Sequence, residues 1–97
     1  MTSPQQRREA VRIAVLEWLA ARPSSAFESV IIRQRLNKSG LLDFSIEEEE
    51  LADAITFLRG SSFVAVTPHP AGATPYYQVT AAGVLAHERG TLNPRPL

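Results

Sequence analysis

The chain has 97 residues, of which 44% are hydrophobic and 21% are charged, a composition typical of one folded domain and unlike that of a disordered chain. It contains no cysteine, which excludes disulfides, a thiol nucleophile and a thiolate metal site, and which fits a reducing compartment. No apolar run has membrane-spanning length and no signal-type apolar segment follows the N-terminus, so we expect a soluble cytoplasmic protein. Ten Lys and Arg residues balance ten Asp and Glu residues, whereas a dedicated nucleic-acid binder usually has a basic excess.

The first predicted helix begins close to the N-terminus. Ser3, Pro4 and Gln6 form the pattern of an N-cap, a first-turn proline and a capping-box partner. We expect the helix to run to about Arg22 and to end before Pro23.

This helix has two apolar sides. The stronger one follows helical spacing and consists of Val11, Ala14, Val15, Trp18 and Leu19. The second lies roughly opposite and consists of Ile13, Leu16 and Ala20. Such a strip is covered either by a second subunit or by the last helix of the same chain. We therefore treat these three residues as candidate dimer-interface residues and expect a homodimer.

The second predicted helix carries a group of cations. Ser25 and Glu28 repeat the capping-box pattern, which opens a helix to about Asn37, and the sequence NKSG then ends it. Its cations are Arg33, Arg35 and Lys38. On helical spacing Arg35 and Lys38 are neighbours, while Arg33 diverges from Arg35. They are candidate phosphate contacts, and a solvated helix surface is the alternative.

The third predicted helix runs from Ser45 to Gly60. Ser45 and Glu48 form a capping-box pattern, Glu47 to Glu50 lie where the helix dipole favours negative charge, and Gly60 is placed to end the helix. The buried stripe is predicted to be Leu51, Ala54, Ile55 and Leu58. The opposite side presents Glu49, Asp53 and Thr56, and Phe57 flanks it as either an interface anchor or a packed core residue.

The periodicity changes after Gly60. Residues 63–67 and 76–80 are β-branched and aromatic runs, which predict two strands joined as an antiparallel hairpin. The loop between them, residues 68–75, has three prolines and no Lys or Arg, only His69. Thr80 then caps a short helix that ends near Gly90, and a minimal extra strand around Ala26 is compatible with the pattern. These elements predict an α+β fold in one domain, residues 1–90, with a flexible tail at residues 91–97.

No set of side chains in the sequence converges into a catalytic or metal site. Consecutive glutamates on a helix point about 100° apart, so the run at residues 47–50 favours helix-start stabilisation over metal binding. His69 and His87 lack the cysteine or spaced acidic partners of a zinc pattern, and the serines lie in caps or turns. We therefore expect neither an enzyme nor a cofactor.

Two stretches resemble winged helix-turn-helix domains of bacterial transcription regulators. ELADAITFLRGSSFVAV resembles their third helix running into the first wing strand, and YYQVTAAGVLA resembles the second wing strand leading into a C-terminal helix. Val79 stands where that family usually has leucine, while Thr80 and Gly83 match. The likeness covers about Arg8 to Arg89. It implies a third helix that enters the major groove of DNA and a hairpin that touches phosphate or the minor groove.

Two functions remain open. The first is a dimeric DNA-binding transcription regulator whose partner is double-stranded DNA; its candidate nucleic-acid contacts are Arg33, Arg35, Lys38, Thr56 and His69. The second is a winged-helix protein-interaction module that does not bind DNA; its candidate partner contacts are Glu49, Asp53 and Phe57. The acidic outward face of the third helix favours the second function, and the domain order favours the first.

Overall fold

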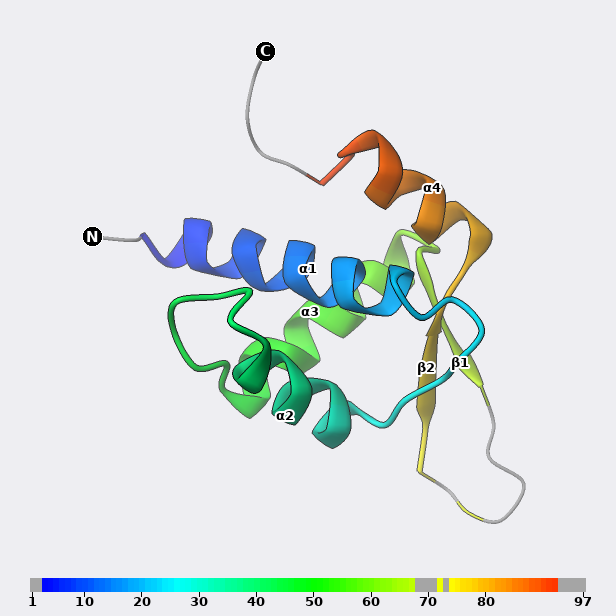
Figure 1. Ribbon diagram of the computed structural model, residues 1–97, viewed down its shortest axis with the longest axis horizontal. Helices are drawn as coiled ribbons and strands as arrows, with labels where there is room; N and C mark the ends of the chain where they lie inside the picture. Colours follow the sequence, from blue (N-terminus) through cyan, green and yellow to red (C-terminus); the bar gives the residue numbers. More distant parts are fainter. Residues whose placement is uncertain (1–2, 68–71, 73, 93–97) are drawn as a thin grey trace.

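The structure, a computed structural model, describes residues 3–67, 72 and 74–92. Its elements follow in the order α1 (Pro4–Ala20), α2 (Ser29–Ser39), α3 (Glu48–Gly60), β1 (Val64–Thr67), β2 (Tyr76–Val79) and α4 (Ala81–Arg89). The predicted α+β architecture of three helices, a hairpin and a closing helix is confirmed. Figure 1 shows α1 across the middle of the molecule, α4 above it, α2 and α3 below and behind it, and the hairpin at one end. None of the helices in the described part of the chain is long and apolar enough to cross a membrane.

The hydrophobic core lies around α1. Sixteen hydrophobic residues are buried, and none of the described polar or charged residues is. Both predicted apolar stripes are part of this core: that of α1 through Val11, Ala14, Val15, Trp18 and Leu19, and that of α3 through Leu51, Ala54, Ile55 and Leu58. The spacing of apolar residues therefore predicted correctly which faces of these two helices are buried.

The N-terminal cap of α1 is as predicted. Ser3 Oγ accepts a hydrogen bond from the Gln6 backbone nitrogen at 3.1 Å, and Gln6 Oε1 accepts one from the Ser3 backbone nitrogen at 3.0 Å. Pro4 occupies the first turn, where its missing N–H costs nothing. The helix ends at Ala20, two residues before the expected Arg22.

The predicted start of α2 at Ser25 is wrong: the helix begins at Ser29 with Glu28 as its N-cap. The backbone of Phe27 is instead paired with Tyr77 of β2, through N–O distances of 2.9 and 2.8 Å. This bridge is the minimal extra strand expected around Ala26, and its extended backbone cannot also be helical. Gly40, with φ of 79°, ends the helix as expected.

The predicted start of α3 at Ser45 is also wrong, because the N-cap is Glu47 and its capping-box partner is Glu50. The side chain of Asn37 holds the backbone of Ile46, with its Oδ1 accepting from the Ile46 nitrogen at 2.8 Å and its Nδ2 donating to the carbonyl at 3.4 Å. Ile46 is buried, so these contacts keep that residue out of the helix.

The end of α3 differs from the prediction as well. Gly60 is the last helical residue and Ser61 is the C-cap, while Ser62 adopts the left-handed conformation with φ of 65°. The backbone nitrogens of Ser62 and Phe63 donate to the carbonyls of Arg59 and Leu58 at 3.0 and 2.9 Å. This is the hydrogen-bond pattern of a Schellman ending with serine in the position that glycine usually takes.

The hairpin pairs β1 with β2 in antiparallel register, with Val64 opposite Val79 and Thr67 opposite Tyr76. Thr80 follows β2 and caps α4 as predicted, because its Oγ1 accepts from the Gly83 nitrogen at 3.0 Å. A Cβ atom on Gly83 would lie 2.2 Å from the Phe63 carbonyl oxygen, so glycine is needed where α4 meets the start of the hairpin.

The chain just beyond α4 is packed rather than free. The Thr91 nitrogen donates to the Ala86 carbonyl at 2.9 Å, and Leu92 packs against the core. These two residues belong to the segment predicted to be a flexible tail; residues 93–97 of that segment lie outside the described part of the chain.

Candidate nucleic-acid interface

The outward surface of α3 consists of the residues that lie outside its buried stripe. The exposed residues of this surface are Glu48, Glu49, Ala52, Asp53, Thr56 and Arg59. Helical spacing of four and three residues puts Ala52, Thr56 and Arg59 in one row, while Glu49 and Asp53 form a second row beside it. Glu48 lies at the start of the first row, which is otherwise neutral to basic, and the second row is acidic.

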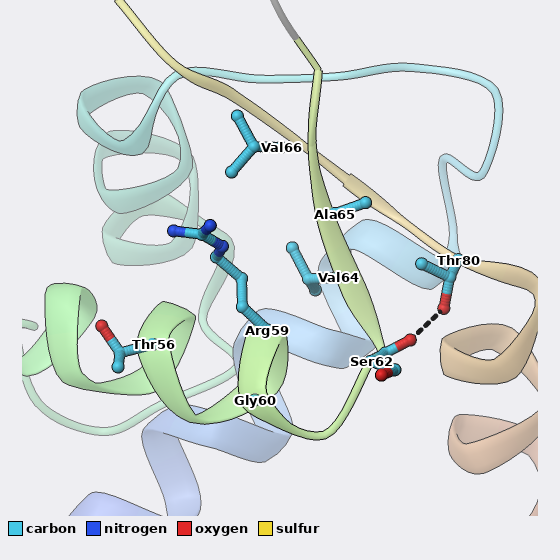
Figure 2. Close-up of a pocket in the computed structure, with 8 residues that line it drawn as sticks. All are labelled: Thr56, Arg59, Gly60, Ser62, Val64, Ala65, Val66 and Thr80. Atoms are coloured by element: carbon cyan, nitrogen blue, oxygen red, sulfur yellow. Dashed lines mark hydrogen bonds between the residues drawn. The ribbon is translucent and has the colours of Figure 1, made fainter.

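An open groove of about 550 Å³ separates the end of α3 from the hairpin. Thr56 and Arg59 line it from α3, and Val64, Ala65 and Val66 line it from β1. Figure 2 shows the Arg59 side chain extending from the last turn of α3 along the face of β1. Among the described residues, Arg59 forms no hydrogen bond or ion pair through its side chain. Its guanidinium group is thus available to an anion that enters the groove.

A smaller hollow of about 100 Å³ lies on the other side of the row, between α2 and α3. Ser29, Val30 and Arg33 line it from the first turn and a half of α2, and Glu48 and Ala52 line it from α3. Val30 is 52% exposed. Arg33 therefore lies beside the α3 surface, with one carboxylate in the same hollow.

Glu50 and Asp53 of α3 lie near cations of α1. Glu50 is paired with Arg7, whose Nε and Nη2 donate to its two carboxylate oxygens, the second at 2.9 Å. The hydrogen bond from Arg7 lowers the pKa of Glu50 and raises that of Arg7. Asp53 lines a hollow of about 160 Å³ together with Glu50, Pro4 and Arg8. Within the described residues, Arg7 thus balances the charge of one member of the glutamate run, Glu50.

Phe57 is covered by the same helix. The guanidinium carbon of Arg12 lies 3.8 Å from the centroid of the Phe57 ring, and Phe57 packs against the core. The Nε atom of Arg12 is buried and has no hydrogen-bond partner among the described residues, so the ring face is the main partner of this cation. The half-buried state of Phe57 is explained by these contacts alone, and its role as an interface anchor stays a prediction.

Comparison with solved structures gives the fold. The chain is similar to a transcriptional regulator from Clostridium thermocellum, with a TM-score of 0.75 and 16% identity over 94% of this chain and 85% of that one. It is also similar to a PadR-like transcription factor from Bacteroides fragilis, with a TM-score of 0.69 and 18% identity over 90% and 82%. The protein F-93 of SSV1 gives a TM-score of 0.61 and 17% identity over 92% and 87%.

The chain is a winged-helix domain. No protein-family model and no curated protein matches its sequence. At identities below a fifth, the solved structures establish the architecture that the two quoted stretches of sequence resemble. In this winged helix, α3 takes the place of the recognition helix and the hairpin is the wing.

The winged-helix structure divides the cations that the sequence grouped on α2. Arg33 lies beside α3, whereas Arg35 and Lys38 line a different groove with Trp18, Arg22 and other residues, on the flank of α2 that faces α1 and Phe27. Arg35 and Lys38 therefore do not share a surface with Thr56. His69, the candidate contact in the wing loop, lies outside the described residues.

The second apolar strip of α1 is covered mainly by α4. Leu16 is only 1% exposed, and Ile13 and Ala20 are half-buried. One small hollow is lined by Ile13, Leu16, Ala86 and Leu92. Of the two expected ways to cover this strip, the structure therefore shows the last helix of the same chain. The burial of Leu16 needs no second subunit, and the dimer interface stays a prediction.

Arg59 is a further candidate nucleic-acid contact, which the sequence interpretation did not name. The available signal was its spacing of three residues from Thr56, which puts both side chains on one helical row. Of the described residues, no group of three or more His, Asp and Glu side chains could hold a metal ion.

Proposed function

We propose that this winged helix binds double-stranded DNA through the row Ala52, Thr56 and Arg59 and acts as a transcription regulator. The observation that supports it best is the unpaired Arg59 guanidinium in the open groove between α3 and the wing. When a recognition helix enters a major groove, the adjoining phosphate backbone runs between helix and wing. The descriptions of the similar solved structures from Clostridium thermocellum and Bacteroides fragilis as transcription regulators agree with this role.

Each residue has a distinct part in this proposal. Arg59 and Arg33 contact phosphates on the two sides of α3, and Thr56 reaches a base edge or a phosphate. Glu49 and Asp53 lie in the acidic row, where they repel phosphates or accept from a cytosine amino group. Few cations and a nearby acidic row predict modest affinity for DNA of arbitrary sequence. The proposed role is DNA binding, without catalysis or a cofactor. A cytoplasmic location is part of the same proposal.

The alternative, a protein-interaction module built on Glu49, Asp53 and Phe57, has less support. Phe57 lies under the Arg12 guanidinium, and Arg8 and Asp53 line the same hollow between α1 and α3. A basic partner would therefore compete with cations already present on α1.

A homodimer belongs to the proposal, since regulators with palindromic operators read two half-sites with two recognition helices. The half-buried Ile13 and Ala20 of α1, next to α4, are the proposed contact region. Light scattering on the purified chain gives the oligomeric state directly.

The experiment that tests DNA binding is fluorescence anisotropy with a mixed duplex pool at about 50 mM and about 200 mM salt. Two phosphate contacts per chain predict an affinity that falls about tenfold between these concentrations. The absence of binding at the lower salt concentration, where electrostatic attraction is strongest, would overturn the proposal.

A further inference from the structure

The hollow of about 100 Å³ between α2 and α3 has an apolar lining that the contacts proposed so far do not use. Val30 lines it from the first turn of α2, and Leu51 and Ala52 line it from α3. Leu51 belongs to the buried core, so this side of the hollow is fixed in place. Val30 is 52% exposed, more than any other large hydrophobic residue in the described part of the chain. A single exposed valine is ordinary on a protein surface, but this one borders the row Ala52, Thr56 and Arg59.

The hollow also carries one carboxylate and one guanidinium. Glu48, the first residue of α3, lines it, and Arg33 lines it from α2, one turn after Val30. Within residues 3–67, 72 and 74–92, neither charged side chain forms an ion pair or a side-chain hydrogen bond. A group that enters the hollow therefore meets an apolar surface, a free hydrogen-bond acceptor on α3 and a free cation on α2.

The hollow continues the proposed DNA-contact row. Ala52 belongs to both, and Glu48 lies one helical turn before it on the same side of α3. In helix-turn-helix domains the N-terminal residues of the recognition helix contact base edges, while the preceding helix crosses the DNA backbone. Glu48 has the first of these positions and Arg33 has the second. In the proposed docking, the hollow therefore faces base edges and Arg33 faces the phosphates.

The major-groove edge of cytosine matches this combination of groups. Cytosine presents its N4 amino group as a donor, and in 5-methylcytosine the adjacent C5 carbon carries a methyl group. Thymine has a methyl group on the same carbon, but its neighbour is the O4 acceptor, which the Glu48 carboxylate repels. Guanine presents two acceptors in the major groove, and neither purine carries a methyl group.

We infer that this hollow reads cytosine and receives the methyl group of 5-methylcytosine. The Glu48 carboxylate accepts a hydrogen bond from the N4 amino group, and the methyl group packs against Val30 and Ala52. This base contact, which rests on the proposed DNA binding, adds the base and the modification that α3 favours. Val30 is then the residue that distinguishes methylated from unmethylated cytosine.

The test compares three forms of one mixed duplex pool by anisotropy at about 50 mM salt. The first form contains the four ordinary bases, the second has 5-methylcytosine in place of every cytosine, and the third has uracil in place of every thymine. Burial of one methyl group predicts that the methylcytosine pool binds about fourfold more tightly than the ordinary pool. The uracil pool should bind as the ordinary pool does. Equal affinity for the ordinary and methylcytosine pools would overturn the inference.

The variant Val30→Ala tests whether the methyl group enters this hollow. It should abolish the fourfold preference for the methylcytosine pool and leave the affinity for the ordinary pool within about twofold. The matched control is Leu85→Ala, which truncates another exposed apolar side chain, on α4, and should keep the preference. Circular dichroism establishes that both variants are folded. A preference that persists in Val30→Ala would overturn the inference, and so would a loss of affinity for the uracil pool that this variant abolishes, since the hollow would then read thymine.

The variant Glu48→Ala tests the hydrogen bond to the base. Duplexes bound from the ordinary pool are sequenced, and the wild type should enrich cytosine at one position of the bound site. Glu48→Ala should lose this enrichment, because the acceptor for the N4 amino group is gone. Glu88→Ala, at an exposed position of α4, removes the same charge and should keep the enrichment. Unchanged cytosine enrichment in Glu48→Ala would overturn the inference.

The three pools also separate the failure of the base contact from the failure of the proposed function. If none of the pools binds at low salt, DNA binding itself is overturned, and the base contact with it. If all three bind with equal affinity, DNA binding stands and the reading of cytosine by the hollow is overturned.

Discussion

Arg7 of α1 and Glu50 of α3 form a two-bond ion pair that links the start of α1 to the start of α3. Nη2 of Arg7 also donates to the Ser45 carbonyl at 3.0 Å, and Glu50 Oε1 accepts from the Glu47 backbone nitrogen at 2.9 Å. One carboxylate thus serves the capping box of α3 and the contact between two helices. The position of the α3 surface relative to α1 therefore depends on a titratable group.

The ion pair predicts how stability depends on pH. The hydrogen bond from Arg7 lowers the pKa of Glu50 in the folded state, so this group stabilises the fold above the ordinary glutamate pKa of about 4.3. That contribution is lost as the pH falls through the lowered pKa. In thermal melts, the Tm difference between the wild type and Glu50→Gln should be largest near about pH 6 and should shrink toward about pH 3. Glu49→Gln, at an exposed position that lacks the contact with Arg7, is the control with the same change of charge.

Gly83 predicts a large loss of stability on adding a single methyl group. In Gly83→Ala the Cβ would lie 2.2 Å from the Phe63 carbonyl oxygen and 2.7 Å from a Val79 methyl group, so α4 or the hairpin must move. We expect the free energy of unfolding to fall by more than about 3 kcal/mol in urea denaturation. In Gly60→Ala the Cβ meets nothing within 4 Å, and this helical position should gain about 0.5–1 kcal/mol. Similar effects of the two substitutions would contradict this assignment.

The sequence predicted the fold well because the buried faces of α1 and α3 follow helical periodicity, which is local information. The prediction was wrong at the starts of α2 and α3. The local capping patterns at Ser25 and Ser45 do not form there, because neighbouring residues are bonded to residues elsewhere in the chain. Phe27 is held by Tyr77, fifty residues away, and Ile46 is held by Asn37. No local pattern records such pairings.

The candidate site was predicted only in part for the same reason. Glu49, Asp53 and Thr56 were correctly placed on the outward side of α3, because that follows from helical geometry. Which cations accompany them depends on how α2 packs, and packing brought Arg33 to α3 while it turned Arg35 and Lys38 toward Trp18. The covering of Phe57 by Arg12 likewise depends on the contact between α1 and α3.

Ser62 predicts a stabilising substitution. It is the described residue other than glycine that has a positive φ, 65°, at the turn between α3 and β1. A left-handed conformation costs a non-glycine residue roughly 1–2 kcal/mol, which glycine avoids. Part of this stabilisation is lost because glycine raises the conformational entropy of the unfolded chain. Ser62→Gly should therefore raise the free energy of unfolding by about 0.5–1 kcal/mol. Ser61→Gly, where φ is −88°, should lower it instead.

The acidic row predicts that removing charge strengthens DNA binding. If α3 enters the major groove, the carboxylates of Glu49 and Asp53 lie near phosphates without paired cations of their own among the described residues. The double variant Glu49→Gln with Asp53→Asn should raise affinity for a mixed duplex pool about fivefold at low salt, from two unfavourable interactions of under 1 kcal/mol each in water. Unchanged affinity and unchanged sequence preference would exclude this docking of α3.

Removing the charge of Arg59 should weaken DNA binding and reduce its dependence on salt concentration. Its side chain lines the open groove between α3 and β1, where a phosphate could reach the guanidinium (Figure 2). In Arg59→Gln, the slope of log K against log salt concentration should become shallower by about 0.9, the value for one phosphate contact on duplex DNA. Arg35→Gln removes the same charge from the far flank of α2, so net charge is matched and the slope should stay at the wild-type value. Equal changes of slope in both variants would mean that DNA responds to the overall charge of the chain rather than to the α3 groove.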